Sequence, residues 1–280
     1  IFYENKISYE ELFTHVNKIA GFLNVKLKIS RGDRIAIIMQ NCPQFIISYY
    51  AILGVNCVIV PVNPMLQVDE ISFILRDSNI KAIFAASDIL NTVNTALKKN
   101  KCMSIPIISI NYLDYIKKRF NVKLPKEFEN KCNNTNNIRK KWKDIVESKL
   151  LNFHHDNKPD EVCIIPYTSG STGIPKGCIH THRTVNIVIN SYAKWLPIPK
   201  KSRVLTTLPL FHVTGMQNSM NVPIFNGNTI VLMTRWDIDT ALFYIKKYKI
   251  KSWRSITASI IDLVSEFKPI KHNISSLISV

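Results

Sequence analysis

The chain has 280 residues, of which 46% are apolar, so it can bury a large core and form one large or two intertwined domains. No apolar run approaches the ~20 residues needed to span a bilayer. No N-terminal stretch resembles a signal peptide either, so we expect a cytoplasmic protein.

Six scattered cysteines show no Cys-x-x-Cys and no paired Cys/His spacing, which argues against a zinc site and a disulfide framework. The formal net charge is +17, but it is unevenly distributed: residues 117–149 carry 11 Lys/Arg against 4 acids. This segment is also rich in asparagine, which predicts a solvated, partly mobile stretch. No recognition-helix pattern or basic-aromatic repeat accompanies it, so we expect no nucleic-acid partner.

The first part of the chain alternates between predicted helices and strands. Ser8 and Glu11 form a capping box, and apolar residues at helical spacing then predict a helix over 8–25. The next predicted elements are a strand at Ile35–Met39, a helix at 43–54, a strand at Cys57–Val60 that Pro61 stops, a helix at Gln67–Asp77 and a strand at Ala82–Ala85. Strands that are apolar on both faces and alternate with helices indicate a parallel sheet covered by helices.

The same alternation returns near the end of the chain. The predicted elements there are a strand at Val204–Leu208, a helical stretch at Gly215–Phe225, a strand at Thr229–Met233 and a helix at Ile238–Tyr248. We therefore predict an α/β fold with largely parallel sheets covered by helices.

A polar loop lies between these two regions and reads Tyr-Thr-Ser-Gly-Ser-Thr-Gly-Ile-Pro-Lys-Gly from Tyr167 to Gly177. Glycines allow backbone N–H groups to converge on an anion, and hydroxyls add donors. Lys176 supplies a positive charge of the kind that binds phosphate oxygens. The loop follows the apolar run 162–165, and a polar loop held after a buried strand is often functional. These features predict a polyphosphate site.

Two other phosphate-binding loops are excluded by the spacing. The Walker pattern Gly-x-x-x-x-Gly-Lys-Ser/Thr fails because Pro175 stands at its second glycine and Gly177 at its Ser/Thr position. The Rossmann pattern fails because Gly170 and Gly173 have no third glycine at the required offset. A flexible Ser/Gly linker is the remaining alternative, and the apolar lead-in disfavours it.

The loop resembles the phosphate-binding signature of the adenylate-forming (AMP-binding) superfamily, which includes acyl-CoA synthetases, amino-acid adenylation domains and luciferases. The run Leu208-Pro-Leu-Phe-His-Val-Thr-Gly-Met216 resembles the acyl-site stretch around a histidine in acyl-CoA synthetases. Three earlier runs are similar to the N-terminal half of that family: Gly32–Asn41, Ala51–Val55 and Val60–Pro64. The likeness covers most of the chain, from about Ser8 to about Thr257.

The resemblance implies that a substrate carboxylate attacks the α-phosphorus of ATP and expels pyrophosphate, and that CoA then takes the acyl group. It implies that the ATP phosphates bind Thr168, Ser169, Gly170, Ser171, Thr172, Gly173 and Lys176. The acyl substrate is expected at Phe211, His212, Gly215 and Met216. Lys176 and His212 are the expected catalytic residues. Mg²⁺ would bridge the phosphates, although no carboxylate that would help to hold it is identifiable in this chain.

We therefore expect an acid–thiol ligase that converts a carboxylic acid, first of all a fatty acid, to an acyl-adenylate and then to an acyl-CoA. An amino-acid or aryl-acid adenylation domain is the alternative, and a non-catalytic basic nucleic-acid-binding module is a more distant one. The resemblance leaves a homodimer open. His180 and His182, two residues apart on one face of an expected strand, lack a third metal ligand and are interpreted as structural.

The resemblance also implies two interleaved α/β subdomains, formed by residues 1–42 plus 197–280 and by residues 43–196, the second of which carries the loop 167–177. The ribose-, Mg²⁺- and CoA-binding segments of the family have no counterpart in this sequence. Its C-terminal lid domain is also missing. We therefore expect the N-terminal part of a longer ligase, inactive by itself.

Overall fold

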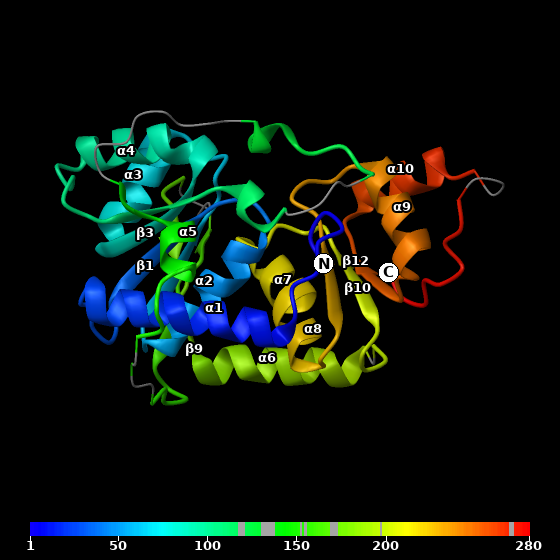
Figure 1. Cartoon of the computed structure of the whole chain (residues 1–280), viewed down its shortest axis with the longest axis horizontal. Helices are drawn as coiled ribbons and strands as arrows, with labels where there is room; N and C mark the ends of the chain where they lie inside the picture. Colours follow the sequence, from blue (N-terminus) through cyan, green and yellow to red (C-terminus); the bar gives the residue numbers. More distant parts are fainter. Residues whose placement is uncertain are drawn as a thin grey trace.

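The computed structural model describes residues 1–116, 121–129, 138–151, 153, 156–168, 173–196, 198–268 and 272–280. Its architecture is two largely parallel sheets covered by helices, as Figure 1 shows. The predicted α/β class is confirmed.

The larger sheet has seven strands within the described residues, in the order β5-β4-β3-β1-β2-β6-β9. Neighbouring strands are parallel except β6 and β9, which are antiparallel. The strands are β1 Arg34–Ile38, β2 Val58–Val62, β3 Ile80–Ala86, β4 Ile107–Ile110, β5 Ile138–Lys141, β6 Val162–Ile164 and β9 His180–Thr181.

A second sheet has the order β11-β10-β12 and is parallel throughout its described strands, β10 Arg203–Thr206, β11 Thr229–Leu232 and β12 Ser252–Arg254. The start of the chain lies beside it, because the N–H of Leu232 donates to the carbonyl of Ile1 at 2.9 Å. The strands β7 Tyr167–Thr168 and β8 Lys176–Gly177 form a short antiparallel hairpin, which is a separate two-stranded sheet.

The described helices are α1 Tyr9–Gly21, α2 Pro43–Gly54, α3 Val68–Asp77, α4 Leu90–Lys99, α5 Trp142–Val146, α6 His182–Trp195, α7 Val213–Met216, α8 Val222–Phe225, α9 Ile238–Tyr248 and α10 Thr257–Glu266. The Ser8 hydroxyl accepts from the Glu11 N–H at 3.0 Å and so caps α1 as predicted. The bounds of α2 and α9 coincide with the predicted ones. α7 continues through the π-helical segment Gln217–Asn221 into α8, so the predicted helical stretch is confirmed. None of the helices in the described part of the chain combines the length and the apolar character that crossing a membrane requires.

The prediction that Pro61 ends its strand is wrong, because β2 continues to Val62 and Pro61 lies opposite Ile37. The carbonyl of Ile59 accepts from the N–H of Ile165, on the β6 side of β2. Residues two apart in a strand point their backbone N–H and C=O groups toward the same neighbouring strand. The backbone nitrogen of Pro61, which carries no hydrogen, therefore also faces the β6 side of β2. β6 pairs with β2 at Ile59 and then ends, so the proline interrupts no ladder bond there.

Strand β1 lies at the centre of the larger sheet, between β3 and β2. This differs from the predicted grouping of residues 1–42 with 197–280, which would separate β1 from its pairing partners. The segment that does contact the second sheet is the very start of the chain, where Phe2 forms a parallel bridge with Leu232. Strand β1 therefore belongs with the larger sheet, and the rest of the predicted division into two subdomains stays a prediction.

Part of the basic segment 117–149 packs against the core, so the prediction of a solvated stretch is wrong for the paired strand β5 and for one face of α5, although most other described side chains of the segment are exposed or half-buried. Strand β5 pairs with β4 at the edge of the larger sheet. The side chains of Trp142 and Ile145 in α5 are 0% and 1% exposed. Residues 117–120 and 130–137 of this segment lie outside the described residues. A lysine-rich segment can therefore still form an edge strand and a short helix that buries one face.

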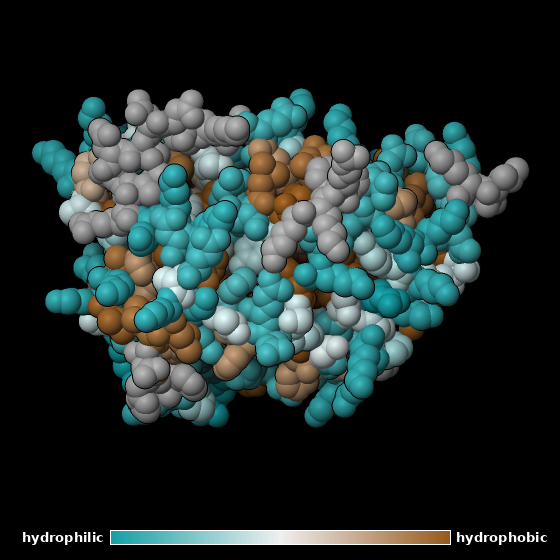
Figure 2. Space-filling view, in the orientation of Figure 1, coloured by the Kyte–Doolittle hydropathy of each residue, from teal (hydrophilic) through white to brown (hydrophobic). Residues whose placement is uncertain are grey.

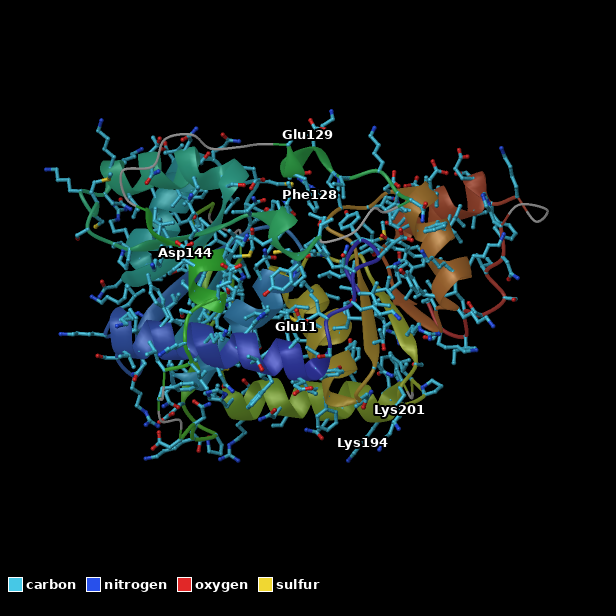
Figure 3. All side chains as sticks on the ribbon, viewed as in Figure 1. Glu11, Phe128, Glu129, Asp144, Lys194 and Lys201 are labelled. Atoms are coloured by element: carbon cyan, nitrogen blue, oxygen red, sulfur yellow. The ribbon has the colours of Figure 1, made fainter. Side chains whose placement is uncertain are left out.

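The surface combines hydrophilic and apolar residues. On the face shown in Figure 2, hydrophilic residues predominate, and apolar patches lie between them. In Figure 3, Phe128 and Glu129 lie on the segment that runs along the upper edge between the two ends of the molecule, and Lys194 and Lys201 lie near the C-terminal end of α6.

Trp142→Ala should lower the free energy of unfolding by about 3–5 kcal/mol, because it removes a large buried side chain from under the sheet edge. The matched control is Lys143→Ala in the same helix, whose exposed ammonium lies 3.8 Å from Glu147; it should change that free energy by only about 0.5 kcal/mol or less. Urea denaturation measures both. Similar small losses in the two variants would contradict the assignment of this segment to the core.

Candidate active site

The hairpin β7–β8 holds the two ends of the predicted phosphate loop together. Thr168 is paired with Lys176 across it, and Tyr167 with Gly177. Side chains directly opposite each other in an antiparallel pair lie on the same face, so the side chains of Thr168 and Lys176 start from the same face of the hairpin. Both residues are exposed. The predicted loop residues between them, Ser169, Gly170, Ser171 and Thr172, lie outside the described residues.

Two hydrogen bonds hold the base of the hairpin. The N–H of Cys178 donates to the carbonyl of Pro166 at 2.8 Å. The hydroxyl of Tyr167 donates to the carboxylate of Asp77 at the end of α3, at 2.5 Å. Burial, followed by the contact with Asp77, raises the pKa of Tyr167. The phenol therefore keeps its proton, and remains a donor, at neutral pH.

Glycine is required at two positions of the hairpin for different reasons. Gly173 has φ +80°, a backbone conformation that side chains with a Cβ rarely adopt. At Gly177 a Cβ would lie 2.8 Å from the Cγ2 of Ile165, so the backbone is pressed against its neighbour. Both features fix the path of the chain around the loop.

The second group of predicted residues follows β10, where the chain turns and begins α7. His212 is the N-cap of α7, and its Nδ1 accepts from the N–H of Thr214 at 3.3 Å. Its imidazole is exposed, Phe211 is half-buried, and Met216 is buried in the main core. A Cβ on Gly215 would lie 2.2 Å from the carbonyl oxygen of Pro209, so this position can hold only glycine without displacement of the turn.

The two groups of predicted residues lie in segments that follow strands of different sheets. The hairpin follows β6 of the larger sheet, whereas the His212 segment follows β10 of the second sheet. Among the described residues no hydrogen bond joins the hairpin to the His212 segment directly. Each group is therefore held by its own sheet.

Three contact residues were not predicted as functional: Tyr167, Asp77 and Asn41. Asn41 follows β1, is 1% exposed and hydrogen-bonds the backbone of Leu208 and Leu210. A polar residue shortly after an apolar strand is a signal that could have identified Asn41. Nothing in the sequence marks Asp77, because its contact with Tyr167 spans 90 residues.

The prediction that His180 and His182 share one strand face is wrong. Strand β9 ends at Thr181, whose side chain caps α6, and His182 is the first residue of that helix. Burial lowers the pKa of His182. In the part of the chain that the structure describes, no group of three or more His, Cys, Asp or Glu side chains is arranged to hold a metal ion.

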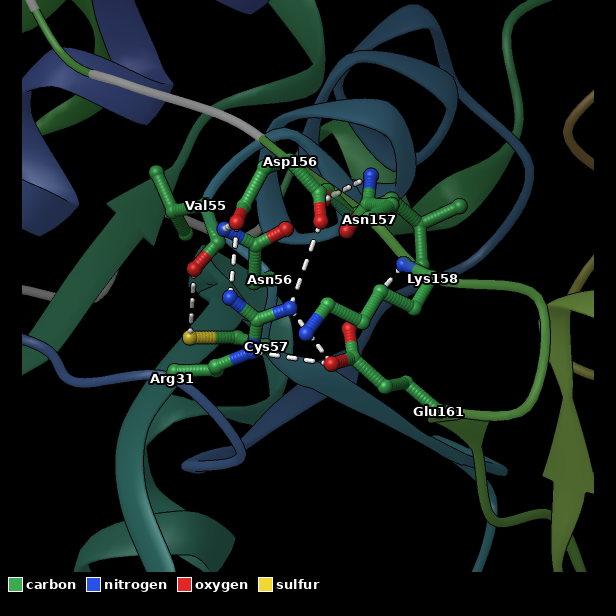
Figure 4. A network of polar contacts seen from close by, with 9 residues as sticks. Arg31, Val55, Asn56, Cys57, Asp156, Asn157, Lys158 and Glu161 are labelled. Atoms are coloured by element: carbon green, nitrogen blue, oxygen red, sulfur yellow. Dashed lines mark hydrogen bonds and ion pairs between the residues drawn. The ribbon is translucent and has the colours of Figure 1, made fainter.

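A polar network at the opposite, amino ends of the strands fixes the segment that leads into β6 (Figure 4). The guanidinium of Arg31, just before β1, pairs with Glu161 and lies 2.7 Å from Asp156. Hydrogen bonds to Glu161 and Asp156 raise the pKa of Arg31. The amide of Asn157 donates to the carbonyl of Leu53 at 3.0 Å. These contacts lie away from the hairpin and act as scaffold for β6.

The sequence profile of AMP-binding enzymes matches residues 1–280. The chain belongs to the AMP-binding enzyme family. The resemblance to adenylate-forming enzymes is thereby confirmed, and the hairpin and the His212 segment are features of a member of this family.

Curated relatives of this AMP-binding enzyme include two CoA ligases. The chain is 30% identical over 258 residues to a long-chain-fatty-acid–CoA ligase of Bacillus subtilis (strain 168), covering 89% of the chain and 45% of that protein. It is 24% identical over 248 residues to a 4-coumarate–CoA ligase of Humulus lupulus, covering 87% of the chain and 41% of that protein. The chain thus spans less than half the length of these relatives.

A solved long-chain-fatty-acid–CoA ligase from Archaeoglobus fulgidus has the same fold. It superposes with a TM-score of 0.77 at 21% identity, covering 95% of this chain and 49% of that one. At this identity the comparison establishes the architecture of the AMP-binding enzyme.

Gly215→Ala should lower the free energy of unfolding by about 1–3 kcal/mol, because the added methyl group overlaps the Pro209 carbonyl. Gly54→Ala is the matched control: its Cβ would meet the Phe153 ring at an ordinary 3.6 Å, and at the end of a helix it should be neutral or stabilising by up to about 1 kcal/mol. Urea denaturation of both variants measures the difference. Equal stability of the two variants would contradict the close packing of α7 on the preceding turn.

Proposed function

We propose that the protein containing this chain uses ATP to activate a carboxylic acid, forming an acyl-adenylate and pyrophosphate, and then transfers the acyl group to CoA. The observation that carries this proposal is the hairpin that pairs Thr168 with Lys176 in an AMP-binding enzyme. The names of its relatives as CoA ligases support the second step.

In the first step, a carboxylate oxygen bonds to the α-phosphorus of ATP, and the bond from that phosphorus to the leaving pyrophosphate breaks. Both reactants are anions, so the site has to neutralise charge and hold the leaving group in line. Lys176 and Thr168, which are paired across the hairpin and present their side chains on one face, are suited to the β- and γ-phosphates. The net charge of +17 favours the approach of these anions.

The His212 imidazole is suited to bind the carboxylate of the acid substrate. Its Nδ1 accepts a hydrogen bond from Thr214, so the neutral ring carries its proton on Nε2. That N–H is then free to donate to a carboxylate oxygen of the substrate. We propose that Phe211, adjacent to His212, and Met216, four residues after it, border the acyl group.

Mg²⁺ is part of the proposal because it neutralises phosphate charge when bound to ATP. The described residues contain no group of three or more metal-ligating side chains that would hold it. No step of the reaction is therefore assigned to a protein-held ion.

A fatty acid is the proposed substrate. Its support is the relative named as a long-chain-fatty-acid ligase and the run Leu208–Met216. The 4-coumarate ligase among the relatives makes an aryl acid the second candidate. We also propose that residues 1–280 do not complete the reaction by themselves, because Lys176 is exposed and water screens its charge.

Acid-dependent exchange of pyrophosphate into ATP tests the proposal. With the full-length protein and a panel of acids, we expect exchange with fatty acids and CoA-dependent formation of the acyl-CoA. The polypeptide 1–280, assayed alongside, should give neither. Exchange with 4-coumarate but no fatty acid would select the aryl-acid alternative, exchange with amino acids alone would indicate a peptide-synthetase-like module, and no exchange with any acid would contradict the proposed function.

A further inference from the structure

The side chain of Asn41 joins the carboxyl ends of strands from both sheets. Asn41 follows β1 of the larger sheet, and its amide donates to the carbonyls of Leu208 at 2.9 Å and Met233 at 3.1 Å. Its oxygen accepts from the N–H of Leu210 at 2.8 Å. Leu208 and Leu210 follow β10, and Met233 follows β11. Both amide hydrogens and the oxygen are therefore used, in a residue that is 1% exposed.

The turn that Asn41 holds leads directly into His212. The N–H of His212 donates to the carbonyl of Pro209 at 3.1 Å. The same carbonyl lies so close to Gly215 that a Cβ there would be 2.2 Å away. Pro209 stands between the two residues that Asn41 binds, Leu208 and Leu210. A displacement of this turn would thus be passed on to the start of α7, where the imidazole is placed.

We propose that Asn41 is a positioning residue for the acid-activating step. It holds the turn 208–210, and through this turn it keeps His212 in position relative to the phosphate hairpin that follows the larger sheet. This role rests on the proposed function. A buried, fully bonded amide is suited to the task, because any shift of the turn leaves buried polar groups unpaired, and because a misplacement of about 1 Å can cost about 100-fold in rate.

A second, partly buried hydrogen bond between distant segments provides a control. The hydroxyl of Tyr50 in α2 donates to the Oδ1 of Asn221 at 2.7 Å. Asn221 lies in the π-helical segment well after His212. Tyr50→Phe removes this bond, and so it should weaken the packing of α2 on that segment without moving the turn that carries His212.

The test is a double-mutant cycle in the full-length enzyme, which separates an effect acting through His212 from one that does not. Asn41→Ala, His212→Ala and the double variant are compared, with Asn41→Ser as a milder change in case the alanine variant folds poorly. The readouts are kcat and KM for the fatty acid in pyrophosphate exchange, together with the ATP dissociation constant from calorimetry. Tyr50→Phe is assayed in parallel.

Asn41→Ala should lower kcat/KM for the acid by about 10- to 100-fold and leave the ATP dissociation constant within about twofold, because the hairpin is not touched. In the His212→Ala background the same change should lower kcat/KM by no more than about threefold. Tyr50→Phe should leave both constants unchanged. Equal losses from Asn41→Ala with and without His212 would overturn the positioning role, as would acid kinetics in both Asn41 variants that match the wild type. A wild-type enzyme without acid-dependent exchange would instead overturn the proposed function, and this role with it.

Discussion

Parallel strands place their carboxyl ends along one edge of a sheet, and in this protein two such edges meet at a single buried amide. The hydrogen bonds of Asn41 to Leu208, Leu210 and Met233 fix the second sheet against the end of β1. Both groups of predicted functional residues lie in segments that follow strands of these sheets, β6 in one case and β10 in the other. The geometry of the candidate site therefore depends on how the two sheets are held together.

Each half of the site is also fastened locally. The phenol of Tyr167 ties the hairpin to α3 through Asp77, and Arg31 holds the segment that leads into β6 from the other end of the sheet. On the other half, Gly215 allows α7 to pack against the Pro209 carbonyl. These contacts restrict the movement of the backbone around the exposed side chains of Lys176 and His212.

Much of the fold could be predicted because its signals are local. Ser8 caps α1, Pro43 begins α2, and the apolar strands alternate with amphipathic helices, so the α/β class and the approximate bounds of the predicted elements followed from short stretches of sequence, although other elements, among them α4, β4, α6, β12 and α10, were not predicted. The phosphate loop was recognisable because its hydroxyls, glycines and lysine all lie within the short run 168–176. The pairing of Thr168 with Lys176 agrees with that reading, although the four residues between them lie outside the described part of the chain.

The remaining features depend on contacts between distant residues. Trp142 is buried only because β5 joins the sheet edge, which lysine-rich composition conceals. Pro61 is tolerated in β2 because of where β6 ends, and His182 begins a helix because Thr181 caps it. The bonds of Asn41 span 167 residues or more. Sequence pattern alone carries no information on such pairings.

The central claim is that the hairpin binds the phosphates of ATP, and calorimetry with ATP tests it most directly. Lys176→Ala in the full-length protein should weaken ATP binding by about 10- to 100-fold, because one charge-assisted phosphate contact contributes about 1.5–3 kcal/mol. Lys200→Ala, which removes an equally exposed charge beyond α6, should leave the affinity within about twofold, since a distant surface charge is screened by solvent and salt. Equal ATP affinity of the wild type and Lys176→Ala, or an equal loss in both variants, would contradict the account.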